Sequence, residues 1–401
     1  MGLMLGLETR ALAQWLSHIL RNGTPVARPV RKAAYLFRLS QEMVRLPKRV
    51  LPSPRVPATI SLILPWRYPV RKIPILAIPV MAALACDTGT EPGALRPEGA
   101  LLSDSPVACQ AAGTTGQTAV YVNQSVIGAT IDFADLGCNM AIYFDAAAPA
   151  DAVVRNTTVI QETGAGGTTT GVWNNGANVT VTNSVFTTNV TGQYVPIRFD
   201  NGATGTIAGN ALSGTHRTGI VIRGAGTDAV VRDNVVTGTG AKTSGWAENG
   251  IQVDEQASAS VLNNTFAGHW WDGPSNWAST AILIYGADGV RVRNNVLVDN
   301  EFSIFLYASN GNTVTGNRTS SAVVSQSVLE FQAYGVLLAG ADNRITGNDF
   351  TAVNGAAGVY IYPGSAGNTF AGNRIEGFDW SLLDGGDDTV VRGKPAEVVT
   401  F

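Results

Sequence analysis

The sequence predicts an all-β chain in which short strands wind into a parallel β-helix, a solenoid of stacked coils. Three observations carry this prediction. A short apolar alternation that ends in Asn recurs through residues 150–380 at spacings of 22–31 residues. A second short apolar strand follows each of these phrases, and the turns are rich in Asn, Asp and the chain's 45 glycines. Repeats of this length are typical of solenoids, so repetition rather than separate globular domains organises the chain.

The recurring asparagines mark one corner of each coil. The sequences VVRDNVV, VRVRNNVL and RITGNDF illustrate the phrase. Its nine asparagines are Asn156, Asn183, Asn210, Asn234, Asn264, Asn295, Asn317, Asn348 and Asn373. Side-chain amides stacked at the strand spacing of about 4.8 Å can hydrogen-bond to one another, so we expect a ladder.

The second strand of each repeat supplies the apolar core. It appears as GIVI (219–222), GIQV (250–253), AILI (281–284), SIFL (303–306), GVLL (335–338) and GVYI (358–361). Each is too short to bury its apolar side alone, so each strand must pair in parallel with its equivalent one coil away. A β-propeller is the competing architecture, but its blades need about 40–45 residues, more than this spacing allows.

Charge divides the chain into two unequal parts. Residues 1–72 carry 13 Lys and Arg against two acids, whereas residues 73–401 have a net charge of −14. We interpret residues 1–66 as a basic, Pro-rich leader that results from a wrongly assigned start. The acidic body argues against nucleic acid as a partner, because phosphate contacts need clustered Lys and Arg.

Residues 67–86 have the pattern of an export signal. Arg67, Arg71 and Lys72 precede the uncharged apolar run from Ile73 to Ala85, which is too short to span a bilayer as a helix. The sequence Ala-Leu-Ala-Cys ending at Cys86 resembles a bacterial lipobox, which implies that Cys86 is acylated. We therefore expect an exported, membrane-anchored lipoprotein of the periplasm or cell surface, with residues 87–100 as a tether. A cleaved signal without lipid, or a buried apolar segment, is the alternative.

Residues 101–401 form the expected β-helix and its end caps. Export leaves Cys109 and Cys138 as an even pair in an oxidising compartment, so a disulfide is expected in the N-terminal cap at 101–124. Two unpaired buried thiols are the alternative. The segment 379–401 is expected to finish the last coil, and its acids discourage end-to-end pairing of the exposed edge.

Alternation along the second strand predicts which side chains point outward. One outward column is Asp200, Arg223, Asp254, Tyr285, Tyr307, Ala339 and Tyr362, and the other is Arg198, Val221, Gln252, Leu283, Phe305, Leu337 and Tyr360. Arg223 and Asp254 are candidate catalytic residues, and Tyr285 and Tyr307 are candidate sugar platforms. The simpler interpretation is a structural charge ladder beside two tyrosines that stack only on each other.

Two lengthened coils gather indole rings near ionisable groups. Trp246, Trp271 and Trp277 are candidate sugar platforms, since Trp faces stack on sugar rings, and Glu248 and His269 complete the candidate catalytic set. The alternatives are a local apolar lid formed by the Trp residues and a surface histidine without a role. The sequence contains no spacing of residues typical of a metal site.

These repeats resemble the right-handed parallel β-helix of the pectate-lyase-like superfamily over about residues 120–385, with about ten coils. The resemblance implies polysaccharide as the partner and a groove along one sheet face as the site. The catalytic motifs of polygalacturonases and mannuronan epimerases are absent. A calcium-dependent lyase would use Arg223 as the base, with Asp254 and Glu248 as cation ligands or acid groups, so calcium is the cofactor that this assignment implies.

The sequence thus favours an exported polysaccharide-engaging monomer that is either a polyuronide lyase or a non-catalytic scaffold or glycan-binding module. Assembly of a copper site, as in some periplasmic β-helix proteins, is a third option. Only Met140 and two His lie in the mature part, which argues against that option.

Overall fold

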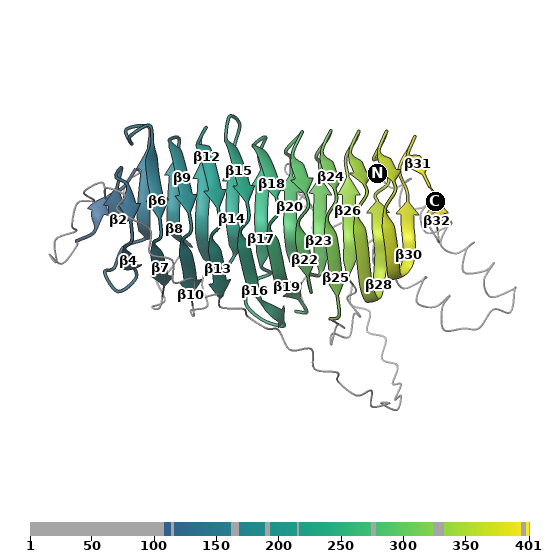
Figure 1. Ribbon diagram of the computed structural model, residues 1–401, viewed down its shortest axis with the longest axis horizontal. Helices are drawn as coiled ribbons and strands as arrows, with labels where there is room; N and C mark the ends of the chain where they lie inside the picture. The colour runs from purple at the N-terminus through teal and green to yellow at the C-terminus, as the bar shows by residue number, and fades with distance from the viewer. Residues whose placement is uncertain are drawn as a thin grey trace, which may run out of the picture. The chain divides into compact units, whose positions relative to one another are not determined.

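The computed structural model describes residues 108–113, 116–161, 168–188, 193–214, 216–273, 278–323, 333–393 and 398–400. The leader, the signal segment with Cys86, and the tether lie outside these residues. Within them the chain forms 32 strands and no helix, so no helix there could cross a membrane. Figure 1 shows the strands side by side in chain order along one stack.

Each coil contributes strands to three ribbons, which we call A, B and C. Ribbon A contains β2 (Thr118–Val122), β5 (Met140–Asp145), β8 (Thr168–Asn175), β11 (Gln193–Asp200), β14 (Thr218–Arg223), β17 (Asn249–Asp254), β20 (Thr280–Tyr285), β23 (Phe302–Tyr307), β26 (Tyr334–Ala339), the second halves of β28 (Asp349–Ile361) and β30 (Arg374–Asp384), and β32 (Val398–Thr400).

Ribbon B contains β4 (Thr130–Asp132), β7 (Thr158–Gln161), β10 (Val185–Thr188), β13 (Ala211–Gly214), β16 (Val235–Lys242), β19 (Thr265–Trp271), β22 (Val296–Val298), β25 (Arg318–Ser321) and the first halves of β28 and β30. Because β28 and β30 run continuously from B into A, the two ribbons form one 21-stranded sheet.

Ribbon C is a separate 11-stranded sheet. Its strands are β3 (Val126–Ile127), β6 (Ala152–Arg155), β9 (Asn178–Thr182), β12 (Thr204–Ala208), β15 (Asp228–Arg232), β18 (Ser258–Leu262), β21 (Arg291–Arg293), β24 (Thr313–Thr315), β27 (Arg344–Thr346), β29 (Thr369–Ala371) and β31 (Val390–Arg392). Each strand pairs in parallel with its equivalent in the next coil, which confirms the predicted right-handed parallel β-helix.

The core is a continuous apolar column inside the three ribbons. In ribbon A, Ile220 pairs with Ile251, Ile251 with Ile282 and Ile282 with Ile304, and all four are fully buried. Strand alternation therefore places the predicted residues inward. Because every coil repeats the arrangement, each short strand buries its apolar side only against its neighbours.

Seven of the nine predicted asparagines form the ladder. The Nδ2 atom of each donates to the Oδ1 atom of the next from Asn210 to Asn373, at 2.8–3.0 Å. The prediction is wrong for Asn156 and Asn183, which have positive φ angles of 52° and 50° and precede the ladder position. Thr157 and Ser184 occupy that position instead, and the Ser184 Oγ atom accepts from the Thr157 amide at 3.2 Å.

A second ladder, absent from the prediction, supports another corner. Asn312 donates to Asn343 at 2.9 Å, and Asn343 donates to Asn368 at 3.2 Å. All three side chains are fully buried. Satisfied amide ladders at two corners hold successive coils in register, because a slip by one residue would leave these buried groups without partners.

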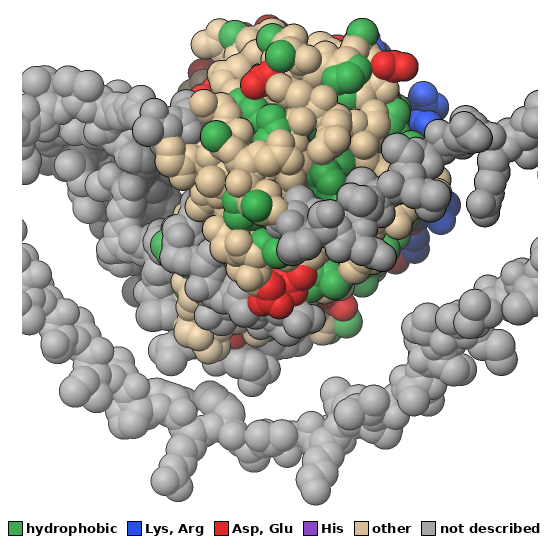
Figure 2. Space-filling model, turned by 90° about the vertical axis from the view of Figure 1, so that its left-hand side faces the viewer, with side chains coloured by type: hydrophobic (Ala, Val, Ile, Leu, Met, Phe, Trp, Pro, Cys, Tyr) green, Lys and Arg blue, Asp and Glu red, His purple; other side chains and the backbone are tan. Residues whose placement is uncertain are grey.

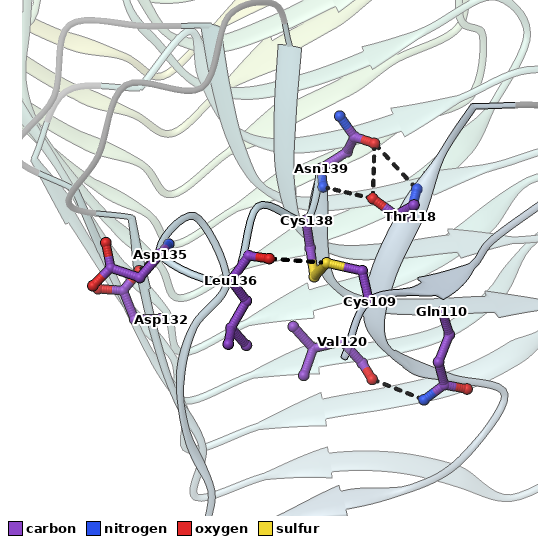
Figure 3. The surroundings of a disulfide bond; sticks show 9 residues. All are labelled: Cys109, Gln110, Thr118, Val120, Asp132, Asp135, Leu136, Cys138 and Asn139. Carbon is purple, nitrogen blue, oxygen red and sulfur yellow. Dashed lines mark hydrogen bonds between the residues drawn. A yellow bond between two sulfur atoms is a disulfide. The ribbon is translucent and has the colours of Figure 1, made fainter. Parts of the chain in front are cut away.

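The predicted disulfide between Cys109 and Cys138 is present, with the two Cα atoms 5.5 Å apart. Figure 3 shows it joining the segment before β1 (Gln110–Ala111) to the turn that ends at Cys138. β1 pairs antiparallel with β2, whose other edge pairs with β5, so the hairpin covers the first coil. At the other end, β31 and β32 finish the last coil as predicted.

Candidate functional site

The outward side of ribbon A carries the two predicted columns in register. Arg223 pairs with Asp254, Asp254 with Tyr285, and Tyr285 with Tyr307 in successive coils. We call the polar and aromatic residues toward the C-terminal end of the ribbon A strands the Tyr–Arg strip. It consists of Arg198, Asp200, Arg223, Gln252, Asp254, Tyr285 and Tyr307.

Asp254 organises the middle of the strip. Its carboxylate accepts from Arg223 Nε at 3.0 Å and from Arg223 Nη2 at 2.7 Å, and Gln252 Nε2 donates to it at 2.5 Å. The Asp254 side chain is only 3% exposed, whereas that of Arg223 is 35% exposed. The hydrogen bond that Arg223 donates to Asp254 raises the pKa of Arg223 above its ordinary value, although partial burial opposes the shift.

Tyr285 and Tyr307 stack on each other in adjacent coils. Their ring centroids are 5.3 Å apart and the rings are nearly parallel, at 12°. Tyr285 is 42% exposed, so the outer ring edge faces solvent. Burial and the neighbouring Tyr285 raise the pKa of Tyr307. The predicted stacking therefore occurs, and it leaves an accessible aromatic edge beside the Arg223–Asp254 pair.

A second Arg–Asp pair continues the strip toward the N-terminal coils. Arg198 donates through Nε to Asp200 Oδ2 at 2.6 Å, and its guanidinium lies 4.4 Å from the centre of the Trp173 ring. Sequence reasoning placed Arg198 in the outward column but missed Trp173. Continuing the alternation by one coil would have found it, since Trp173 pairs directly with Arg198.

Glu248 lies at the opposite end of the ribbon A strands. Its carboxylate is fully buried, and it accepts from Lys242 Nζ at 2.9 Å and from the Thr239 amide at 2.9 Å. β16 and β19 extend past their corner to form this region, with a register shift between Thr237 and Gly240. Glu248 thus neutralises a partly buried lysine in a closed corner.

The predicted tryptophans are at this closed corner rather than on the strip. Trp271 is 3% exposed and Trp246 is half-buried, whereas Trp277 lies outside the described residues. Trp271 donates its backbone amide to Glu301 Oε2 at 3.2 Å. The buried Trp271 ring does not offer a face to a sugar in this arrangement, which fits the alternative interpretation of a local lid.

His269 is buried in the same corner and faces a second histidine. Its Nε2 atom lies 3.2 Å from the Nε2 atom of His216, and both side chains have at most 1% exposure. Burial lowers the pKa of His216 to about 4, and burial together with the neighbouring His216 lowers that of His269 to about 3. Both rings are therefore neutral at neutral pH.

Each neutral imidazole has one N–H group, so the two rings have two N–H donors for three ring contacts. His216 Nδ1 faces the carbonyl oxygen of Gly214 at 2.9 Å, and His269 Nδ1 faces Asn300 Oδ1 at 3.0 Å. The orientation of the Asn300 amide is set by its backbone contacts, since its Nδ2 donates to Phe266 O and its Oδ1 accepts from the His269 amide. With both Nδ1 protons donated, no proton remains between the two Nε2 atoms. No pattern in the sequence indicates this pairing.

The four predicted catalytic residues do not converge. Glu248 precedes β17 and Asp254 ends it, so their Cα atoms are separated by about 20 Å at the rise of a β-strand. His269 lies with Glu248 at the start of the ribbon A strands, and Arg223 lies with Asp254 at their end. The predicted residues therefore divide into a closed buried corner and the open Tyr–Arg strip.

Among solved structures, the chain is similar to the A-module of the mannuronan C-5 epimerase AlgE6 of Azotobacter vinelandii, at 14% sequence identity and a TM-score of 0.36, over 70% of this chain and 74% of that one. A search of curated proteins finds no match.

A family model described as periplasmic copper-binding protein (NosD) matches residues 122–324 and 242–391, two overlapping matches that together span more than half of the chain. The periplasmic description supports the prediction of export. It does not bear on the predicted lipid anchor. On the strength of these matches, the chain belongs to the NosD family.

Proposed function

We propose that this protein is an exported glycan-binding module whose ligand lies along the Tyr–Arg strip. The observation that carries the proposal is the parallel stack of Tyr285 and Tyr307 beside the Arg223–Asp254 pair on a rigid outward face. A sugar polymer offers both apolar C–H surface and hydroxyl groups, and this combination of aromatic and polar groups matches both.

The strip favours a ligand rich in hydroxyl groups. Arg198 and Arg223 are each neutralised by an Asp partner, and Glu255 lies 3.9 Å from Arg223 Nε, so the strip has no net positive charge. The remaining N–H groups of Arg223 and the hydroxyls of both tyrosines are available to hydroxyl oxygens. Because strand pairing holds these groups in place, little conformational entropy would be lost on binding.

The surroundings of Arg223 and Glu248 argue for glycan binding rather than for β-elimination. A lyase base must lose its proton, whereas the pairing with Asp254 raises the pKa of Arg223. Glu248, the second predicted cation ligand, is fully buried and is engaged by Lys242. No group of three or more His, Cys, Asp or Glu within the described residues could hold a metal ion, so calcium gains no support.

The described residues do not bring together ligands for copper, the metal that the family description names. Copper favours imidazole and sulfur ligands. Cys109 and Cys138 are joined in the disulfide, and Met140 is buried in a separate apolar cluster. His216 and His269 supply two nitrogens at a hydrogen-bond separation of 3.2 Å, less than the roughly 4 Å that two bonds of about 2.0 Å in line would require. These residues do not fit a copper centre, and we assign none.

The test is binding of the purified β-helix to a panel of neutral and acidic polysaccharides by affinity electrophoresis. Tyr285→Ala and Tyr307→Ala should each weaken binding to the preferred glycan, because each removes part of the aromatic edge. Trp246→Ala is the matched control, since it removes a half-buried aromatic ring from the other corner. Equal losses in all three variants would contradict a site on the strip.

An activity assay separates the binding module from a lyase. The protein is incubated with polyuronides, with and without calcium, and the absorbance of unsaturated products is followed. Binding without product supports the module, whereas product formation that Arg223→Ala abolishes would show catalysis at the strip. The absence of both binding and product would contradict the proposal.

The remaining partner assignments are part of the proposal. We expect a monomer in solution, attachment to a membrane only through a lipid on Cys86, and no nucleic-acid ligand. Size-exclusion chromatography with light scattering tests the first of these.

A further inference from the structure

Basic side chains of the β-helix gather on the outward side of ribbon C. The structure describes twelve Lys and Arg residues, and six of them point outward from this one sheet. They are Arg155, Arg232, Arg291, Arg293, Arg344 and Arg392. Figure 2, a view along the stack, shows Lys and Arg side chains gathered toward one edge of the molecule. A body with a net charge of −14 over residues 73–401 thus presents one basic face.

Four of these arginines follow a regular pattern, and we call them the arginine face: Arg232, Arg291, Arg293 and Arg344. Arg232 pairs with Leu262, which pairs with Arg293, and Arg291 pairs with Thr313, which pairs with Arg344. Arginine therefore occurs on β15, β21 and β27, which belong to every second coil. The strands between them, β18 and β24, carry uncharged residues at the paired positions. Two strand spacings separate the charged coils by about 10 Å, and Arg291 lies about 7 Å from Arg293 on one strand.

These guanidinium groups are free to meet a ligand. All four side chains are exposed. Among the described residues, Arg291, Arg293 and Arg344 form no ion pair, whereas the arginines of the Tyr–Arg strip are both paired with aspartates. Arg232 pairs only with Asp233 at 2.7 Å, and both side chains are about half exposed. Such an exposed pair contributes little and can exchange its carboxylate for that of a ligand.

Nearby acidic residues do not neutralise the positive charge of the arginine face. Asp228 begins β15, four residues before Arg232, and Asp288 and Asp342 lie in the turns that precede β21 and β27. Asp288 Oδ1 accepts from the Asn310 amide, which directs this carboxylate along the turn. Uncharged Thr, Ser and Leu side chains fill the positions between the arginines. The exposed Asp228 shares the outward side of β15 with Arg232, about 13 Å away along the strand.

We propose that the arginine face binds a linear acidic polysaccharide, with its carboxylate or sulfate groups on alternate coils. Guanidinium groups bind such anions through paired N–H donors. The repeat of about 10 Å along a flat, rigid face matches a polymer with regularly spaced charges. This surface lies on a different ribbon from the Tyr–Arg strip, so the protein would join an acidic glycan on one face to a hydroxyl-rich glycan on another.

The experiment compares two triple variants that remove the same charge. Arg291→Gln/Arg293→Gln/Arg344→Gln removes most of the arginine face, and Arg155→Gln/Arg318→Gln/Arg392→Gln removes three exposed arginines that have no regular spacing. The probes are polygalacturonate, a sulfated polysaccharide, neutral dextran, double-stranded DNA, and vesicles containing phosphatidylglycerol. Circular dichroism and the unfolding midpoint verify that both variants remain folded.

We expect the wild type to bind an acidic polysaccharide but not dextran through this face, with affinity that falls as salt rises. The first variant should lose at least about tenfold in affinity, and the second should stay within about twofold. Equal losses in both variants would show a response to net charge alone and would overturn the proposal. Equal or tighter binding of DNA or vesicles, or no binding of either acidic polymer, would also overturn it.

The result is independent of the glycan site on the strip. Tyr285→Ala should leave binding of the acidic polymers unchanged, whereas the arginine variant should leave binding at the strip unchanged. Failure of one of these surfaces therefore does not imply failure of the other.

Discussion

The Nε2 atoms of His216 and His269 lie 3.2 Å apart although 53 residues separate the two histidines in the chain. The contact is formed because coils of 22–31 residues return the backbone to the same corner, and the extension of β19 closes that corner from solvent. Two neutral imidazoles then share a buried contact that lacks a proton. A third proton would place a positive charge in a fully buried site, and burial therefore keeps both rings neutral.

This relationship predicts a loss of stability in mild acid. Each histidine has an ordinary pKa of 6.5 when unfolded and a pKa of about 4 or about 3 when folded. The unfolded state therefore binds more protons below pH 6.5, so the free energy of unfolding should fall as the pH decreases from 7 to 5. The expected loss is about 2 kcal/mol per histidine by pH 5. Urea unfolding at several pH values measures it.

The double variant His216→Gln/His269→Gln provides the control for the pH effect. It removes both titrating groups, so its stability between pH 7 and pH 5 should vary much less. The same pH dependence in the wild type and the double variant would assign the effect to other groups.

The asparagine ladder predicts that substitutions at two neighbouring residues change the free energy of unfolding by very different amounts. Asn264 donates to Val231 O and Asn295 Oδ1, and its own Oδ1 accepts from Asn234. Asn264→Ala should lower the free energy of unfolding by about 3 kcal/mol, because several buried groups lose their partners. Asn263→Gly is the matched control, since Asn263 is exposed at a φ of 55° that glycine adopts readily. Similar effects of the two substitutions, measured by urea unfolding, would contradict the role of the ladder.

Removal of the disulfide should destabilise the N-terminal coils. The bond joins residues 29 positions apart. Cys109→Ser/Cys138→Ser should cost about 3–4 kcal/mol according to the chain-entropy model. Hydrogen exchange should rise first in β1, β2 and β5, which the bonded segment covers, and remain low in the central coils. Uniform exchange along the whole stack would show that the cap acts globally.

The lipid anchor is predicted from the signal pattern that ends in Ala-Leu-Ala-Cys at Cys86, outside the described residues. Expressed in a bacterium that processes lipoproteins, the wild type should sediment with membranes, and the peptide that begins at Cys86 should carry the mass of an acyl modification. Cys86→Ser should shift the protein to the soluble fraction, because it removes the acyl chains and the apolar run Ile73–Ala85 is too short to span a bilayer as a helix. Peptides from residues 1–66 in the native protein would contradict the interpretation of the leader.

The sequence by itself determined the fold, the inward and outward sides of ribbon A, and the disulfide. These features depend on local alternation and on repetition, and each coil packs against copies of the same pattern. The ladder shows the limit of this reasoning, because Asn156 and Asn183 match the phrase by residue type but are displaced by one position, and only the strand register reveals that Thr157 and Ser184 take their place.

Tertiary structure alone decided that the candidate side chains divide between the open Tyr–Arg strip and a closed buried corner. Alternation already placed Arg223 and Asp254 in one outward column, and they meet as equivalent residues of adjacent coils. Asp254 and Glu248 are close in sequence but lie at opposite ends of one strand. Trp271 is buried because the extended β16 and β19 fold over a corner, and no periodicity in the sequence encodes the path of that extension. The arginine face likewise depends on which coils are neighbours, since a pattern on every second coil exists only after residues far apart in the chain have been stacked.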